Sequence, residues 1–330
     1  MKELGKKKSF RSSLKILNPE EVIADAKLQP VRKRLVGSFI RSGINTLFFS
    51  RTNVGKSIFG FEIAYHISKG ISLNNSNTFK NESKPKKVLF YDAELNSQMM
   101  YERYPEALKQ IDNEYFMYVS EKETGKILMG KDLINELSKI AEEFNAEFII
   151  VDNISKILPD SLDAKQSAEI INLLKLSRER TGADWFVIGH TKKTNPKECI
   201  KPIDYHGSSM IQNFFLEIFY LDETNDGRFL LRHAKCKHAD AHIDSVPILN
   251  RKMIDGYGLG FEFEEMEEYE KVKKPDFITQ DLNKKNIKEY EKEIRILFSK
   301  KIGATRISEL MGCSRNTIYR IVNNSKQGDS

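Results

Sequence analysis

Short apolar runs alternate with segments of helical periodicity along the chain from residue 44 onward. The runs are rich in β-branched and aromatic residues and predict buried strands at 44–50, 87–93, 115–120, 147–153 and 184–190. Between them, apolar residues recur at helical spacing over 56–69, 97–110, 131–144 and 164–181. Strand and helix in alternation predict an α/β fold, a mainly parallel sheet with helices on both faces.

The pattern changes after residue 190. The runs FFLEIFYLDE at 214–223 and RFLLRHAK at 228–235 are separated by a Thr-Asn-Asp-Gly turn. Two apolar runs joined by such a turn predict a hairpin, which would add antiparallel strands to the edge of the sheet. Residues 70–86 are polar and rich in turn formers, so we expect an exposed loop there.

Composition and charge divide the chain into four parts. We expect a basic N-terminal arm at 1–35, the α/β domain at 36–270, a polar linker at 271–286 and a small all-α domain at 287–330. At 330 residues with 40% hydrophobic and 30% charged residues, the chain is long enough for one sizeable core and a small second domain.

The net charge of +6 is unevenly distributed. Residues 1–35 carry ten Lys and Arg against four Asp and Glu, residues 271–330 carry fourteen against seven, and residues 36–270 carry 29 against 36. Basic ends on an acidic core favour a polyanionic partner, nucleic acid first. Two solvated tails would give the same charge pattern.

The sequence contains no apolar run near the roughly 20 residues needed to cross a bilayer, and its basic start lacks the apolar stretch of a secretory signal. We therefore predict a cytoplasmic protein without a membrane partner. Its three cysteines, Cys199, Cys236 and Cys313, are far apart and form no Cys-x-x-Cys pair, which argues against a disulfide framework or a zinc ribbon.

The segment FFSRTNVGKSIFGFEIA, residues 48–64, runs from a predicted strand through Gly-Lys-Ser into a predicted helix. Gly55, Lys56 and Ser57 fit the end of the phosphate-loop pattern, while Ser50 stands where the first Gly belongs. Such a loop aims backbone N–H groups and a Lys at phosphates, and its hydroxyl at Mg²⁺. The residues expected to hold a nucleotide here are Asn53, Val54, Gly55, Lys56, Ser57 and Ile58. A capped helix start is the structural alternative.

Two acids follow neighbouring predicted strands. Asp152 ends EFIIVDN, where an acid is needed for the metal of an ATP–Mg²⁺ site, and Glu94 follows VLFYDA, where it can activate water against a γ-phosphate. Asp152, like Asp92, could instead cap or hydrogen-bond the backbone at a strand end, and Glu94 could be a surface residue. Because these features occur in the order that one site requires, the sequence predicts an ATP site with Mg²⁺ held by Ser57 and Asp152.

Six segments in this order resemble the motifs of RecA-like motor ATPases: SRTNVGKS, DAELNSQMMYER, FIIVDN, VIGHTKK, HGSSMIQNFF and RHAKCKH. They are most similar to those of plasmid-type hexameric replicative helicases, the RepA-like proteins related to DnaB. The resemblance covers roughly residues 30–250 and is specific through its ordering. It implies a RecA-like ATPase domain at 36–270.

The resemblance also implies roles for individual residues. Lys56 would bind phosphates, Glu94 would be the catalytic base, and His190 would sense the γ-phosphate. Lys235 and Lys237 match a basic pair that reaches the site of a neighbouring subunit, which implies a homo-oligomer, a hexameric ring in that family. The family commonly has Arg at the second position, and a Lys cannot reproduce the bidentate grip of a guanidinium.

The same segment is dense in potential metal ligands: His233, Cys236, His238, Asp240 and His242. Their spacing matches no zinc pattern, and the basic pair already gives the segment another interpretation, so the sequence argues against a metal there.

Residues 302–323, IGATRISELMGCSRNTIYRIVN, predict two short helices around a Gly-Cys-Ser turn and resemble the helix-turn-helix of site-specific resolvases and invertases. Residues 288–301 would form the supporting first helix. A helical bundle for protein contacts is the alternative. The residues expected to contact DNA are Arg306, Ser314, Arg315, Asn316, Thr317, Tyr319 and Arg320.

Together these features predict a DNA-associated ATPase, a replicative helicase or motor of a plasmid or mobile element, with single-stranded DNA in the ring and duplex DNA on the helix-turn-helix. Two alternatives stay open. An ATP-switched DNA-binding regulator without unwinding activity is favoured somewhat by Lys237, and a recombinase-like filament former predicts open helical assemblies.

Overall fold

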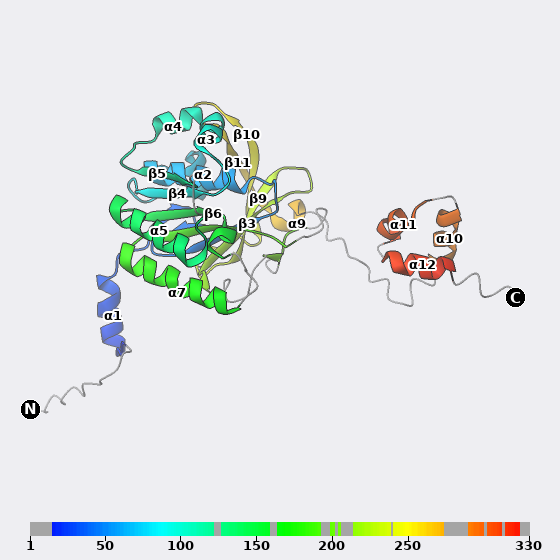
Figure 1. The fold of residues 1–330 in the computed structure, drawn as a ribbon, viewed down its shortest axis with the longest axis horizontal. Helices are drawn as coiled ribbons and strands as arrows, with labels where there is room; N and C mark the ends of the chain where they lie inside the picture. The colour runs from blue at the N-terminus through cyan, green and yellow to red at the C-terminus, as the bar shows by residue number, and fades with distance from the viewer. Residues whose placement is uncertain are drawn as a thin grey trace, which may run out of the picture.

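The computed structural model describes residues 15–121, 127–158, 164–192, 199–201, 204–205, 214–238, 240–273, 290–299, 302–311 and 314–323. A 9-stranded sheet dominates this part of the chain (Figure 1). In spatial order its strands are β11 (Gly258–Glu268), β10 (Ser245–Ile254), β9 (Phe229–Lys235), β8 (Glu217–Glu223), β3 (Thr46–Ser50), β7 (Asp184–His190), β6 (Phe148–Asp152), β4 (Val88–Asp92) and β5 (Phe116–Ser120).

The strands from β8 to β5 pair in parallel, and β9, β10 and β11 are antiparallel additions at one edge. The predicted fold class is therefore confirmed. In register, Ser50 pairs with His190 and Asp92 pairs with Asp152. The carboxyl ends of four parallel strands thus meet at one edge of the sheet, which is where open α/β sheets bind ligands.

Helices cover both faces of the sheet (Figure 1). α2 (Lys56–Lys69) packs on one face, against inward residues such as Phe48. α5 (Gly130–Phe144) and α7 (Ala164–Thr181) cover the other face, against residues such as Leu47. Because side chains alternate along a strand, each strand contributes apolar side chains to the hydrophobic cores on both faces of the sheet. Its run therefore looks continuously apolar in sequence, as predicted.

The helix predicted over 97–110 is broken in the structure. It forms α3 (Ser97–Arg103) and α4 (Pro105–Gln110), with Tyr104 between them at φ −134° and ψ 46°. A residue that precedes proline is driven out of the helical region, so Pro105 ends one helix and starts the next.

The loop predicted at 70–86 is anchored more firmly than its composition indicated. It contains two 3₁₀ turns, η1 (Leu73–Asn75) and η2 (Asn77–Phe79), and the side chains of Leu73 and Phe79 are fully buried in the core. The expectation of an exposed loop was wrong for these two positions, because isolated apolar residues in a polar stretch carry no periodicity. A small ribbon of β1 (Arg34–Val36) and β2 (Ile40–Arg41) also went unpredicted.

The β10–β11 hairpin was missed as well. Its outer half alternates charged and apolar residues, and β11 contacts α2 while pairing with β10. This brings the hairpin over the start of α2, so residues about two hundred positions after the phosphate loop lie beside it.

Within the predicted N-terminal arm, α1 (Pro19–Leu28) begins with a capping box between Asn18 and Glu21 and has no buried residue. Two further short helices are α6 (Ile154–Ile157) and α9 (Tyr269–Val272). None of the helices in the described ranges is long and apolar enough to cross a membrane.

At the C-terminal end, α10 (Glu291–Ser299), α11 (Ala304–Met311) and α12 (Arg315–Asn323) form a cluster of their own. Its small core consists of Ile294, Ala304, Ile307, Ile318 and Ile321. The side chains at the end of α11 and the residues between it and α12 lie outside the described part of the chain.

Candidate functional site

The phosphate loop connects β3 to α2. Two residues in it have positive φ, Asn53 at 67° and Gly55 at 114°. Ser50 ends β3 with an extended backbone, so it needs no left-handed conformation. Replacing the first Gly of the pattern by Ser therefore introduces no strain at this position.

The start of α2 is suited to bind an anion. Gly55 is the N-cap, and no side chain caps this end of the helix in the described structure. The first N–H groups of α2 thus remain available at its positive end. Gly55 is also required by space, because a Cβ on it would lie 2.7 Å from Cζ of Phe261.

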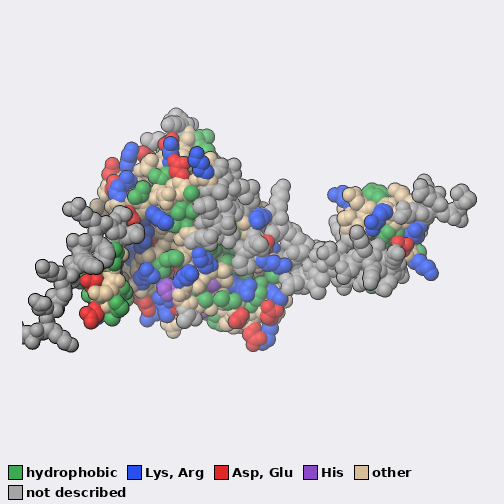
Figure 2. All heavy atoms as spheres, turned by 90° about the horizontal axis from the view of Figure 1, so that it is seen from below, with side chains coloured by type: hydrophobic (Ala, Val, Ile, Leu, Met, Phe, Trp, Pro, Cys, Tyr) green, Lys and Arg blue, Asp and Glu red, His purple; other side chains and the backbone are tan. Residues whose placement is uncertain are grey.

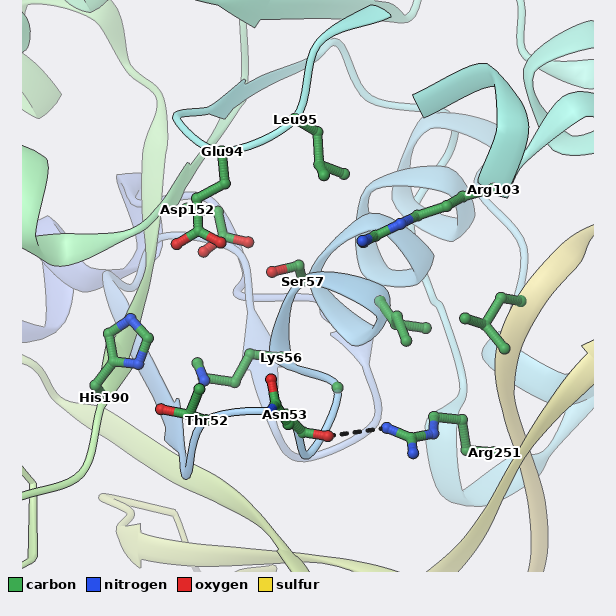
Figure 3. Close-up of a pocket in the computed structure, with 13 residues that line it drawn as sticks. Thr52, Asn53, Lys56, Ser57, Glu94, Leu95, Arg103, Asp152, His190 and Arg251 are labelled. Carbon is green, nitrogen blue, oxygen red and sulfur yellow. Dashed lines mark hydrogen bonds between the residues drawn. The ribbon is translucent and has the colours of Figure 1, made fainter. Parts of the chain in front are cut away.

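A cavity of about 370 Å³ opens at this edge of the sheet. Side chains from the loop and from the ends of three strands, β4, β6 and β7, point into it (Figure 3). It is lined by Thr52, Asn53, Gly55, Lys56, Ser57, Ile58, Glu94, Leu95, Arg103, Asp152, His190, Arg251 and Leu259. The structure thus brings together the predicted residues Asn53, Gly55, Lys56, Ser57, Ile58, Glu94, Asp152 and His190.

Asp152 is the acid most affected by this environment. It is 2% exposed, and its Oδ2 has no hydrogen-bond partner among the described residues. Burial raises its pKa to about 7, the Ser57 hydroxyl opposes that rise, and the carboxyls of Asp92 and Glu94 add to it. Because the charges repel and one oxygen is unbonded, the cluster fits a divalent cation.

The donor set consists of oxygens, which are the ligands that Mg²⁺ prefers. Ser57 and Asp152 would hold the ion. When bound, Mg²⁺ neutralises charge on phosphate oxygens.

Glu94 is exposed at the cavity and is held by its neighbours. Asp92 Oδ1 accepts the N–H groups of Glu94 at 2.8 Å and Leu95 at 2.9 Å, which fixes the turn after β4. Asn153 Nδ2 donates to Glu94 Oε1 at 2.9 Å. Asp92 therefore has the structural role that the sequence left open for it, while Asn153 orients the predicted base.

Lys56 lies between the loop and the acids. Its side chain is buried, and Nζ donates to the carbonyl oxygen of Arg51 at 2.9 Å. Burial lowers the pKa of Lys56, and the nearby carboxyls of Asp152 and Glu94 oppose that fall. The Lys56 ammonium thus lies within the phosphate loop, where it is expected to bind phosphates.

Sequence reasoning missed two arginines in the cavity. Arg103 reaches it from α3, and Arg251 reaches it from β10 (Figure 3). Arg251 Nη1 donates to the carbonyl oxygens of Asn53 at 3.1 Å and Val54 at 3.2 Å. Arg103 ends the segment DAELNSQMMYER but was given no role, and Arg251 approaches only because the β10–β11 hairpin lies over α2.

Three predicted residues do not line the cavity. The Val54 side chain packs against the hydrophobic core, so only its backbone faces the phosphate position. Lys235 ends β9 and Lys237 follows it, both near the opposite edge of the sheet, since Ile218 at the start of β8 pairs with Lys235. They are too far along the sheet to serve this chain's own cavity.

Six of the seven predicted DNA-contacting residues lie on α12 or cap it, and Arg306 belongs to α11. Ser314 caps the helix, accepting the Thr317 N–H at 3.1 Å. Tyr319 is 49% exposed, and Thr317 is half-buried. Arg315, Asn316 and Arg320 are exposed as well. The side chain of Arg306 lies outside the described residues.

Known proteins provide a family for this arrangement. A comparison with curated proteins gives no match. Among solved structures, the KaiC-like protein PH0186 from the hyperthermophilic archaeon Pyrococcus horikoshii OT3 is 13% identical, over 70% of this chain and 99% of that chain, with a TM-score of 0.46. Residues 11–196, more than half of the chain, match the AAA domain family. The chain therefore belongs to the AAA domain family and, with its phosphate loop and strand-end acids, is a P-loop ATPase.

Proposed function

We propose that this protein is a DNA-associated motor ATPase, a RepA-like replicative helicase of a plasmid or mobile element that works as a ring. The ATPase part of this proposal rests on one observation, the cavity in which five predicted residues converge: Lys56, Ser57, Glu94, Asp152 and His190. Four sheet strands deliver these groups to one edge, an arrangement that suits phosphoryl transfer.

Each side chain has a distinct part in hydrolysis. The N–H groups at the start of α2 and the Lys56 ammonium bind the phosphates, and Glu94 accepts a proton from the attacking water. Asn153 positions the Glu94 carboxylate through its 2.9 Å hydrogen bond. His190, at the end of β7, senses the γ-phosphate. The loop that Arg251 holds keeps the N–H groups aimed at the nucleotide.

Lys235 and Lys237 act in the neighbouring subunit's site. Their distance from this chain's own cavity supports a role in another copy, as in a ring whose interfaces each complete one site. Two lysines supply charge there without the planar fork of an arginine.

The helical cluster delivers the ring to duplex DNA. Lys and Arg side chains project from its surface (Figure 2). On α12 the buried Ile318 and Ile321 leave Arg315, Asn316, Tyr319 and Arg320 on the outer face. A helix that starts with exposed polar and basic residues suits the major groove.

A second candidate is an ATP-switched DNA-binding regulator that does not unwind DNA. Lys237 favours it, because without a bidentate cation from the neighbour the transition state gains less stabilisation. In this case ATP binding changes the assembly or its DNA affinity, and turnover is slow.

The deciding experiment measures ATP hydrolysis by the full chain without DNA, with single-stranded DNA and with duplex DNA. Lys56→Ala and Glu94→Gln are the catalytic variants. Arg320→Glu tests the helical cluster, and Lys292→Glu, an equal charge reversal on exposed α10, is its matched control.

Turnover that single strands stimulate, and that Lys56→Ala and Glu94→Gln both abolish, supports the motor. Loss of duplex binding in Arg320→Glu, with normal binding in Lys292→Glu, supports the DNA-delivering cluster. ATP binding without turnover under every condition would refute the motor and leave the regulator. Electron microscopy with ATP and DNA separates closed rings from filaments.

A further inference from the structure

A second cluster of polar side chains lies away from the nucleotide cavity. Glu217 begins β8, His233 lies within β9, and Cys236 follows the end of β9. The ligand atoms of these three side chains all lie within 4.8 Å of one another. Glu217 is 0% and His233 is 3% exposed, so the cluster is built into the interior of the sheet domain.

Two polar atoms in this cluster have no hydrogen-bond partner in the described structure. They are Oε2 of Glu217 and Nε2 of His233, while Oε1 of Glu217 pairs with Nε2 of His238 at 3.4 Å. Buried polar groups are almost always bonded, so two unbonded atoms in a group that also holds a thiol favour a ligand there. A fully buried carboxylate is the most costly of them to leave unbonded.

His238 adds a fourth donor, because its Nε2 lies 3.4 Å from Glu217 Oε1. One thiol, two imidazoles and one carboxylate make a mixed S, N and O set. Zn²⁺ accepts all three donor types in a tetrahedral site, whereas Mg²⁺ selects oxygen. We propose that Glu217, His233, Cys236 and His238 bind one Zn²⁺ ion.

The structure also separates these ligands from the other polar residues of the segment. Asp240 pairs with Arg34 at 3.0 Å and Arg41 at 2.6 Å, so its carboxylate is already engaged. The spacing of the segment fails to match a zinc pattern because the ligand set needs Glu217, from the neighbouring strand.

Zinc binding changes one hydrogen bond. His233 Nδ1 accepts the His242 N–H at 2.9 Å, so the neutral ring carries its proton on Nε2. Coordination through Nε2 moves that proton to Nδ1 and releases the His242 amide. Because Phe39 stacks on the His233 ring at 4.5 Å, the ring keeps its plane and the loop around half-buried His242 moves instead.

The ion would also fix the segment that carries the basic pair. Cys236 and His238 are direct chain neighbours of Lys235 and Lys237, so coordination would restrict the segment that carries both lysines. This consequence depends on the proposed function, whereas the metal site itself does not.

The test uses the full chain, stripped of metal with a chelator and then titrated with Co²⁺ and Zn²⁺ in separate experiments. Thiolate coordination to Co²⁺ gives a charge-transfer absorption in the near ultraviolet, which the oxygen ligands of the nucleotide site cannot produce. We expect one Co²⁺ per chain with this band, displaced by Zn²⁺. ATP turnover plays no part in the readout, so failure of the ATPase proposal leaves this result unaffected.

Cys236→Ser should abolish the band and lower Zn²⁺ affinity more than about a hundredfold, since changes outside the ligand set alone cost about 10- to 100-fold. Cys199→Ser and Cys313→Ser are the matched controls and should keep the band. Absence of the band in the unmodified chain, or its persistence in Cys236→Ser, would overturn the proposal. The unmodified chain alone shows whether the band exists, even if the Cys236→Ser variant does not fold.

Discussion

Glu62 makes the stability of the sheet domain depend on pH. It lies in α2, is 1% exposed, and its Oε2 accepts the Phe261 N–H at 3.0 Å. Burial raises its pKa from 4.5 to about 8, partly opposed by that hydrogen bond. The hydroxyls of Tyr104 and Tyr257 also lie close by and have no hydrogen-bond partner in the described structure.

The sign follows from proton binding. Below pH 4.5 the carboxyl is protonated in both the folded and the unfolded chain, so it contributes no pH dependence. Between pH 4.5 and about 8 only the folded chain holds the proton, so stability falls as pH rises. At about 1.4 kcal/mol per pH unit this interval gives a ceiling of about 5 kcal/mol, and we expect about 2–5 kcal/mol.

Glu62→Gln should remove this dependence, because the amide stays neutral and its oxygen can still accept the Phe261 N–H. The assay is urea unfolding at several pH values, followed by the fluorescence of Trp185. This is the only tryptophan of the chain, and it is fully buried in the sheet. The variant should match the unmodified chain at pH 5 and exceed its stability by about 2–5 kcal/mol at pH 9. Equal slopes of stability against pH in both proteins would refute the reasoning.

Three further predictions concern the cavity. Gly55→Ala should abolish ATP binding and destabilise the domain by about 1–3 kcal/mol, because φ is 114° and a Cβ would lie 2.7 Å from Phe261; nucleotide titration and urea unfolding check this. Asn153→Ala should lower kcat by about tenfold with little change in KM, since it frees Glu94; steady-state kinetics that show only a KM effect would contradict it. Arg251→Leu should weaken ATP binding by about tenfold, measured by calorimetry, because two loop carbonyls lose a charged donor; unchanged affinity would remove its role.

Local signals were sufficient for much of the fold. The predicted helix at 56–69 and the predicted strand at 184–190 have the bounds seen in the structure. Their hydrophobic patterns are strong enough to identify these elements without tertiary information. The β10–β11 hairpin was missed because its alternation of charge and apolar residues is weaker than that of a buried strand. The break at Pro105 was visible in the sequence and was overlooked.

The order of strands and helices, the phosphate loop and the acids at strand ends were all predictable from the amino-acid sequence. This was possible because parallel strands place their carboxyl ends at one edge, which turns a linear order into a site. Three contacts became visible only in the folded chain: Arg251 holds the loop, Asn153 orients Glu94, and Glu217 joins His233 and Cys236. The contacts of Arg251 and of Glu217 join segments that are distant in the sequence or belong to different strands. The contact of Asn153 with Glu94 depends on how the ends of two strands meet. Side-chain pairing across a sheet is set by packing and register, which no local pattern encodes.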